Sequence, residues 1–317
     1  IDEVVQQSVK KKVLPAIERR IRTELTEKAD EGAIKIFAVN LKNLLLQAPL
    51  AGHVIMGLDP GYRTGCKMAI IDAQGNVLDY GAYYLTSSDR QRQEAQKRLA
   101  ALIKKYKVSL LSIGNGTASY ETEQFVSKMI EEEGLACHYI ITNEAGASVY
   151  SASKLAIDEL PDLDVTIRGA VSIARRIQDP LAESVKIDPK SIGVGQYQHD
   201  VNQKLLTSTL DQVVETVVNH VGVELNTASP AILQHVAGIS SAVAKNIVAY
   251  RHDQGAFASR KQLLKVPRLG PAAFTQCAGF LRIQGAKNPL DNTQVHPESY
   301  ELAKQIIGEL GFTLQDL

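Results

Sequence analysis

Two carboxylates stand where buried strands are predicted to end, and such groups could hold a metal ion or meet a phosphate. Asp59 follows the apolar run Val54–Leu58, and the sequence Asp-Pro-Gly at 59–61 breaks the strand because Pro fixes φ and Gly allows positive φ. Glu144 comes two residues after a second run, His138–Thr142. Ligands collect at the strand ends of a helix-covered sheet, so we expect the two acids to meet. The plainer alternative is that Asp59 only caps its turn.

Further polar groups lie in the same predicted loops. The loops span 59–65, 114–117 and 143–146, and they add Gly61, Arg63, Asn115 and Thr117 to the candidate pocket. Two carboxylates repel unless a cation lies between them, but two-metal phosphoryl chemistry needs more oxygen ligands than this set supplies. None of the loops has the spacing of a nucleotide-binding Walker motif. We therefore predict no bound metal and no cofactor.

An internal repeat is the second candidate site. Residues 233–242 align with residues 263–272 at a shift of 30, and each copy is predicted to be a short helix, a tight hairpin and a second helix. A helix start after a hairpin points main-chain N–H groups outward, which suits phosphate. The predicted nucleic-acid contacts are hairpin residues and nearby cations: Gly238, Ile239, Ser240, Lys245, Arg260, Lys261, Lys265, Arg268, Leu269 and Gly270. The alternative is a helical packing unit with an ordinary basic surface.

Composition limits the class of protein. The 317 residues include 35 basic and 35 acidic ones, and 44% are hydrophobic, which is enough for two or three packed domains. No apolar run approaches the ~18 residues of a membrane span, and no signal-peptide pattern is present. Three distant cysteines form neither a disulfide framework nor a zinc motif. The predicted location is the cytoplasm, with no membrane partner.

The elements that must position these residues fall into four predicted segments. Residues 1–51 are helical, with an apolar residue at every fourth position from Val5 to Leu25 and a second helix over 32–46. Residues 52–193 read β-β-β-α-β-α-β-α, which predicts a mixed sheet with helices on its faces. Residues 194–285 are all helical and hold the repeat. Residues 286–317 form a linker and a final helix.

Several motifs together resemble the Tex family of bacterial transcription accessory proteins along essentially the whole chain. They are the paired hairpins and the stretches LDPGYRTGCKMAIID, IGNGTASYETE, NEAGASVYSAS, RGAVSIARRIQDPLAESVKIDPKSIGVGQYQHDV and NPLDNTQVHPESY. The resemblance implies a YqgF-type domain of the RNase H-like, resolvase-like fold, then tandem helix-hairpin-helix units. It also implies a longer N-terminal helical region and a C-terminal OB-fold domain outside this chain, and a relation to a eukaryotic transcription elongation factor that binds RNA polymerase.

The resemblance also shows where this sequence departs from active nucleases. Nucleases of the YqgF and resolvase type carry an Asp on the first strand, a Glu after a later strand and an Asp at the start of the last helix. Asp59 and Glu144 match the first two, but the third position falls near Arg168 and Gly169. We expect Arg168 to join the pocket, where its cation would oppose a metal. The site is therefore predicted to be degenerate.

The hairpins depart from their family pattern as well. That pattern is Gly-hydrophobic-Gly, whereas the first hairpin reads Gly238-Ile239-Ser240 and the second reads Arg268-Leu269-Gly270. A residue other than Gly at positive φ costs on the order of 1 kcal/mol. We therefore expect a distorted backbone in one of the two hairpins.

Three functional hypotheses follow. The first is a non-catalytic scaffold that binds RNA or DNA without sequence preference and acts in transcription. The second is a structure-selective nuclease that would use Asp59 and Glu144 with Mg²⁺. The third is a protein-interaction scaffold whose flanking helices, over 1–48 and 298–310, dock RNA polymerase or another domain.

Overall fold

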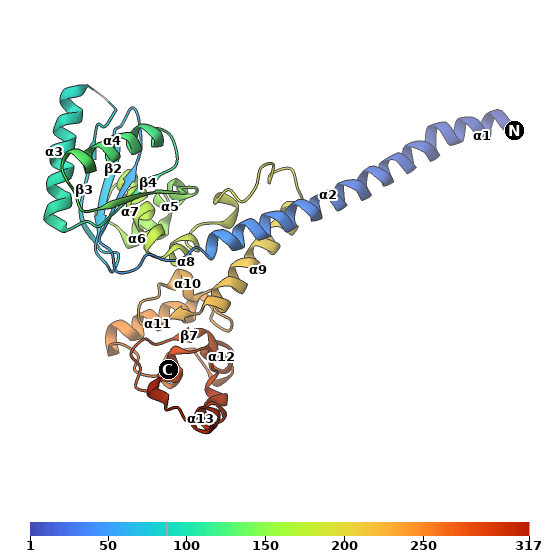
Figure 1. Ribbon diagram of the computed structural model, residues 1–317. Helices are drawn as coiled ribbons and strands as arrows, with labels where there is room; N and C mark the ends of the chain where they lie inside the picture. The colour runs from blue at the N-terminus through green and yellow to red at the C-terminus, as the bar shows by residue number, and fades with distance from the viewer. Residues whose placement is uncertain (87, 317) are drawn as a thin grey trace.

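A five-stranded mixed sheet forms the centre of the larger lobe (Figure 1). The computed structural model describes residues 1–86 and 88–316. The strand order is β3-β2-β1-β4-β5, with β2 antiparallel to both of its neighbours, β1 and β3, and with β4 and β5 parallel to β1. The strands are β1 Ile55–Asp59, β2 Cys66–Ile71, β3 Val77–Tyr83, β4 Leu110–Gly114 and β5 His138–Thr142. The predicted mixed sheet is confirmed.

Helices cover both faces of this sheet. Buried residues of α3 (Asp89–Tyr106) and α4 (Ser119–Glu132) pack on one face, and α7 (Val165–Gln178) packs on the other. Gly57 of β1 lets α7 approach closely, because a Cβ there would lie 2.3 Å from the carbonyl oxygen of Ala170. The short helices α5 (Ala147–Ser151), α6 (Lys154–Glu159) and α8 (Pro180–Ser184) flank α7.

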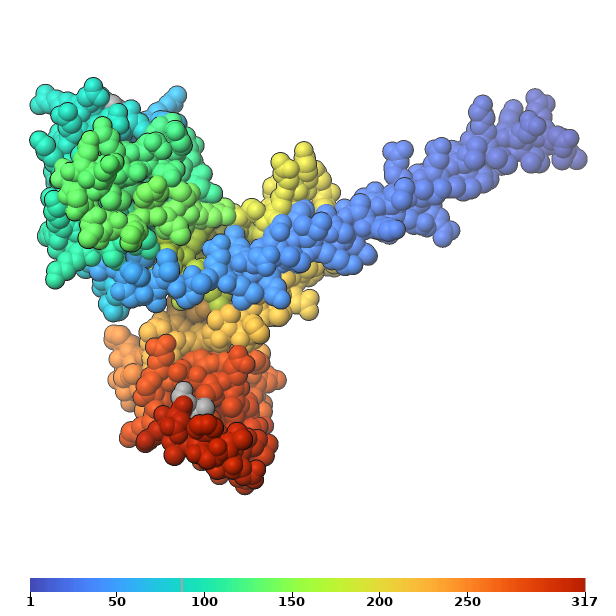
Figure 2. Space-filling view, in the orientation of Figure 1, coloured from blue at the N-terminus to red at the C-terminus, as the bar shows by residue number. Residues whose placement is uncertain are grey.

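The N-terminal segment is one continuous helical rod that projects far from the body (Figures 1 and 2). It runs through α1 (Asp2–Ser8), a π-helical turn η1 (Val9–Val13) and α2 (Leu14–Leu45). The prediction of two helices was wrong, because α2 runs without a break from Leu14 to Leu45. Gly32 lies inside α2 and starts no new helix.

Only the second half of this rod is packed. Its buried residues are Ile34, Phe37, Leu41 and Leu45, and α2 lies against α9 (Gln203–Val221). The apolar stripe that begins at Val5 stays exposed through Leu25, which is 63% accessible. The period-four pattern therefore predicted the helix correctly but not its burial.

The second lobe is mostly helical, as predicted. Its main elements are α10 (Pro230–Leu233), α11 (Ser241–Gln254), η3 (Arg260–Lys265) and α12 (Pro271–Cys277), with a two-residue ladder between β6 (Val223–Glu224) and β7 (Leu281–Arg282). The remaining elements are η2 (Pro189–Ser191), η4 (Ala278–Phe280), η5 (Pro289–Asn292), η6 (Pro297–Ser299), α13 (Tyr300–Glu309) and η7 (Leu314–Asp316).

One hydrophobic core joins this lobe to the packed half of the rod. It contains Phe37 from α2, Leu210 from α9, Ile247 from α11 and Leu263 from η3. The two hairpin units therefore sit on a continuous core rather than on a flexible tether. Within the described residues, no helix combines the length and the apolar character that crossing a membrane requires.

Candidate functional site

Asp59 is the last residue of β1, and its carboxyl group is mostly buried. Burial and the nearby negative charge of Glu144 raise the pKa of Asp59 to about 6, while Lys67 acts in the opposite direction. Lys67 lies directly across the β1–β2 ladder from Asp59. The Lys67 ammonium donates to the carbonyl oxygens of Thr64 and Gly65. A built-in cation thus stands beside the first carboxylate.

Glu144 reaches the same end of the sheet from the loop after β5. Its main-chain N–H donates to Asn115 Oδ1 at 3.1 Å, which ties this loop to the one after β4. The side chain fits because two residues are glycines: a Cβ at Gly114 would lie 2.0 Å from Glu144 Oε2, and one at Gly116 would lie 1.7 Å from Oε1. The predicted meeting of the loops is thus observed.

The electrostatics of Glu144 follow from its burial. Burial raises the pKa of Glu144, whereas the main-chain N–H of Gly116 and the positive charge of Arg176 act to lower it. Among the described residues, Glu144 Oε2 is buried without a hydrogen-bond partner. Arg176 Nη1 donates to the carbonyl oxygens of Asn143 at 2.7 Å and Ala145 at 2.8 Å, so this buried cation fixes the loop that carries Glu144.

Gly169, rather than Arg168, faces the first carboxylate. A Cβ at Gly169 would lie 2.9 Å from Asp59 Oδ2, so this position of α7 points at the site without a side chain. Arg168 turns elsewhere, because its Nε donates to Leu160 O at 3.2 Å and its Nη1 to Ser151 O at 3.3 Å. The cation in the pocket is Lys67, and the expectation that Arg168 would join the pocket was wrong.

The residues present do not fit a two-metal site. No group of three or more His, Cys, Asp or Glu residues gathers anywhere in the described part of the chain. A divalent cation at Asp59 and Glu144 would lack a third carboxylate and would meet the Lys67 ammonium. We derive no metal-dependent step from this arrangement.

The hollow beside Asp59 differs from the predicted pocket. It has a volume of about 280 Å³, and its lining includes Lys67, Gly169 and four residues with hydroxyl groups: Thr64, Ser148, Ser151 and Thr166. Of the seven predicted pocket residues, only Asp59 lines it; Gly61, Arg63, Asn115, Thr117, Glu144 and Arg168 do not. Sequence reasoning missed Lys67, although pairing the strands about the turn at 60–65 would have placed it opposite Asp59.

The two hairpins of the repeat have the same backbone conformation at their first position. Gly238 has φ of +81° and Arg268 has φ of +67°, while Gly270 has an ordinary negative φ. The second hairpin therefore keeps the shape of the first, and the strain falls on Arg268 rather than on the path of the chain. The side chains of Ile239 and Leu269 are buried in the shared core.

Both hairpins hold main-chain donors that are not used within the described part of the protein. Within the described residues, the N–H groups of Gly238, Ser240, Arg268 and Gly270 have no protein acceptor, and all four residues are exposed. Ser240 Oγ accepts a hydrogen bond from the N–H of Val243 at 3.3 Å, so Ser240 is the N-cap of α11. Free N–H groups on an exposed bend are the donors that phosphate oxygens require.

An asparagine from the preceding helix braces each hairpin. Asn219 of α9 donates to His235 O at 3.1 Å and accepts from the N–H of Ala237 at 3.0 Å. Asn246 of α11 donates to Pro267 O at 2.8 Å. Neither asparagine was singled out in the sequence, because the contacts join residues 16–21 positions apart. The bracing fixes the hairpins before any ligand arrives.

Four of the five predicted cations are on the surface, and the fifth is not. Lys245, Lys261, Lys265 and Arg268 are exposed around the hairpins. Arg260 is only 1% exposed, and its guanidinium donates to Leu281 O at 2.7 Å, Val295 O at 2.7 Å, Tyr300 Oη at 2.8 Å and Thr293 O. Arg260 therefore fastens the 288–300 segment to the hairpins. Its prediction as a nucleic-acid contact was wrong.

Comparison with known families agrees with this architecture. Residues 53–178 match the family described as the Tex protein YqgF-like domain. Residues 218–282 match the helix-hairpin-helix motif, and residues 288–317 match an HHH domain. The sheet and the paired hairpins lie within the first two matched ranges.

Curated relatives match over nearly the whole chain. It is 54% identical over 98% of its length to Protein tex of Bordetella pertussis, covering 39% of that protein. It is 52% identical over 99% of its length to the transcriptional accessory protein Tex of Neisseria gonorrhoeae, covering 41%. It is 53% identical over its full length to protein YdcI of Bacillus subtilis, covering 44%.

The chain thus spans about two fifths of the length of these relatives. Its matched domains, in the order YqgF-like then helix-hairpin-helix, are those that the sequence motifs predicted. With this identity sustained across both lobes, the chain belongs to the Tex family of transcription accessory proteins.

Proposed function

We propose that this chain is a non-catalytic scaffold that binds RNA or DNA through sugar-phosphate contacts at its two hairpins and acts in transcription. The observation that carries the proposal is the pair of braced, exposed bends with free main-chain donors, surrounded by Lys245, Lys261, Lys265 and Arg268. Such donors and cations contact phosphates, so they supply affinity without reading bases.

The absence of a cutting step in this proposal rests on the carboxylate site. Gly169 offers no ligand where it faces Asp59, and Lys67 places a positive charge opposite that residue. An ammonium group beside Asp59 lowers the benefit of a divalent cation there. The RNase H-like lobe then serves as a rigid support for the hairpin lobe.

The test is a charge reversal measured against salt. The double variant Lys245→Glu and Arg268→Glu should weaken binding to every sequence tested, by on the order of 10- to 100-fold, and lower the salt slope by about two phosphate contacts. The control is Lys204→Glu, compared with Lys245→Glu alone so that the change in charge is equal, because Lys204 is exposed on α9 outside the hairpins. Fluorescence anisotropy on unrelated RNA and DNA oligomers between about 50 and 200 mM salt gives both quantities.

Two results would contradict the proposal. The first is a wild-type affinity that does not change with salt concentration. The second is equal weakening by the control, which would mean that net charge rather than the hairpins determines binding.

A structure-selective nuclease is the second candidate, because Asp59 and Glu144 are brought together and interact electrostatically. Its test is cleavage of branched DNA and RNA with Mg²⁺ or Mn²⁺, comparing the wild-type protein with Asp59→Ala. Metal-dependent cleavage that the substitution abolishes would establish this activity. Equal background in the two proteins would reject it.

The place of the scaffold in transcription is also part of the proposal. The exposed apolar stripe from Val5 to Leu25 offers a surface for RNA polymerase or an associated protein, and we place this action in the cytoplasm. Pull-down of RNA polymerase by the wild-type protein, with loss after Ile17→Asp and Ile21→Asp, is the expected result. Recovery by both proteins alike would direct the search to another surface.

A further inference from the structure

The outer edge of the sheet and helix α3 enclose a groove that neither candidate site uses. Its volume is about 390 Å³, and one side is lined by Tyr80 to Tyr83 of β3 and by Tyr84, which follows the strand. The other side is one face of α3, with the spacing i, i+3, i+4 and i+7: Gln91, Glu94, Ala95 and Arg98. An edge strand beside a helix face is the geometry in which an extended peptide adds a strand to a sheet.

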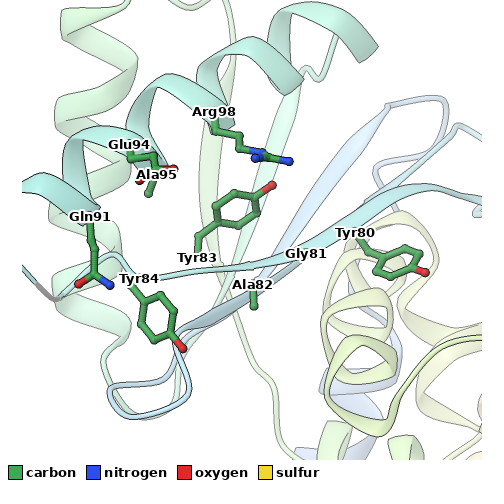
Figure 3. A pocket seen from close by; sticks show the side chains of 9 residues that line it. All are labelled: Tyr80, Gly81, Ala82, Tyr83, Tyr84, Gln91, Glu94, Ala95 and Arg98. Carbon is green, nitrogen blue, oxygen red and sulfur yellow. The ribbon is translucent and has the colours of Figure 1, made fainter.

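Small residues keep this groove open. Gly81, Ala82 and Ala95 lie along it, and a Cβ at Gly81 would come within 3.1 Å of the Tyr83 ring. In Figure 3, Tyr83 points toward Arg98 across the groove, whereas Tyr80 and Tyr84 project from the strand away from α3. Tyr80 is 51% and Tyr84 is 42% exposed, so aromatic surface flanks the open strand edge.

The main chain of the edge is available over part of its length. Among the described residues, β3 pairs with β2 alone, so alternate N–H and C=O groups point to the open side. At one end, Asp79 Oδ1 accepts from the N–H of Tyr80 at 2.8 Å, and Asp79 Oδ2 accepts from Tyr106 Oη at 2.9 Å. Asp79 thus closes that end, and the segment from Gly81 to Tyr84 remains for pairing.

The charges around the groove are mostly positive, although Glu94 lines it together with Arg98. Helix α3 carries six basic residues against Asp89 and Glu94. Arg98 lies at the groove beside Tyr83, and its positive charge works against the rise in the pKa of Tyr83 that burial causes. A peptide carboxylate placed against Arg98 would gain a charge-assisted contact that a lysine would not.

We propose that an extended, acidic peptide segment of a partner protein binds this groove by adding a strand to β3. Its main chain pairs with Gly81–Tyr84, one acidic side chain meets Arg98, and alternate apolar side chains contact Tyr80 and Tyr84. A second copy of the chain fits less well. Pairing over about four residues, or roughly 13 Å of strand, buries far less than the ~1,200 Å² of a stable protein interface.

The probe is a pool of fluorescent synthetic peptides of about ten residues, in which Asp or Glu alternates with Val, Ile, Leu or Phe. Binding to the wild-type protein is expected by anisotropy below about 1 mM, and Arg98→Glu is expected to weaken it about tenfold or more. The matched control is Lys97→Glu, a neighbouring exposed residue of α3 that does not line the groove. It should change affinity less than about twofold. Thermal unfolding of each variant confirms that it is folded.

Two further pools separate strand pairing from simple charge attraction. Peptides with alternate main-chain nitrogens methylated keep their charge but lose edge hydrogen bonds, so they should bind about tenfold more weakly. Peptides with Lys in place of the acids should also bind more weakly. The proposal is overturned if no acidic pool binds, if methylation has no effect, or if both charge reversals act equally. It is also overturned if wild-type protein forms a dimer that Arg98→Glu abolishes, because the edge would then pair with itself.

Discussion

At the scale of single residues, the ionisation of Asp59 determines the energetics of the carboxylate pocket. Burial and the charge of Glu144 together outweigh the charge of Lys67, so the neutral form of Asp59 persists to a higher pH in the folded chain than in the unfolded chain. A carboxyl whose pKa is raised by folding binds a proton more tightly when folded than when unfolded. The protein therefore loses stability as the pH rises from about 4 to about 6, and the loss persists above that range.

Replacing Asp59 with Asn should make this loss disappear. The rise in pKa from 3.8 to about 6 corresponds to on the order of 2–3 kcal/mol at neutral pH. We expect Asp59→Asn to be more stable than the wild-type protein by about that amount at pH 7, and nearly equal to it near pH 4. Urea denaturation at several pH values measures the difference. A variant that is less stable at pH 7 would show that the ionised carboxylate has a partner that stabilises it.

Arg268 combines two roles that a second substitution separates. Its backbone has φ of +67°, which only Gly adopts without strain, and its side chain is an exposed cation. Arg268→Gly should raise the free energy of unfolding by roughly 0.5–1 kcal/mol, while removing one proposed phosphate contact. Chemical denaturation and anisotropy measure the two effects on the same protein. Lower stability would mean that the side chain contributes more than the strain costs.

At the scale of elements, the 288–300 segment is held by one buried arginine. The Arg260 guanidinium reaches β7 through Leu281 O and the last segment through Val295 O and Tyr300 Oη. Tyr300 Oη also donates to Asp291 Oδ1, whose side chain is buried. The network joins η3, β7 and α13, so the stability of the hairpin lobe depends on it.

Removing this guanidinium should be costly. We expect Arg260→Met to lower the free energy of unfolding by about 3–5 kcal/mol, because it leaves the carbonyl oxygens that the guanidinium binds without their donor. Arg260→Lys should not restore stability, since one ammonium group cannot donate to all the oxygens that the planar guanidinium reaches. Lys261→Met, at the neighbouring exposed position, should change it by less than about 0.5 kcal/mol. Equal, small effects at both positions would refute a fastening role.

At the scale of the whole molecule, the helical rod divides into a free half and a packed half. None of residues 1–33 is buried, whereas Phe37 packs so tightly that a Cβ at Gly195 would lie 2.0 Å from its ring. The free half carries the exposed apolar stripe, and Figure 2 shows it projecting away from both lobes. Of the two halves of the rod, only the second half of α2 therefore contributes to the core of the body.

Deleting residues 1–28 tests this division. The free energy of unfolding of the body should change by less than about 1 kcal/mol, because no buried side chain is lost. Phe37→Ala, in the packed half, should cost about 3–4 kcal/mol through lost burial and a cavity. Denaturant unfolding followed by circular dichroism compares the two. A large loss of stability on deletion would show that residues 1–28 support the core.

What the sequence determined by itself was local. Apolar runs, turn residues and the 30-residue repeat predicted the sheet, the hairpins and their order, because periodicity and turn chemistry act over a few residues. Its motifs also identified the family that the comparisons then showed. The prediction that Asp59 and Glu144 lie near the same end of the sheet rested on a general rule about strand ends, and the charge of Glu144 does influence Asp59.

Only the tertiary structure decided which side chains face the sites. Arg168 and Arg260 look like surface cations in sequence, yet carbonyl groups distant along the chain take up both guanidinium groups. Burial of the stripe from Val5 to Leu25 likewise depends on what packs against it, and periodicity carries no such information. Lys67 lies opposite Asp59 because of the register between β1 and β2. The groove at β3 forms because α3 packs beside that strand. Such contacts join residues far apart in the chain, so spacing along the sequence does not specify them.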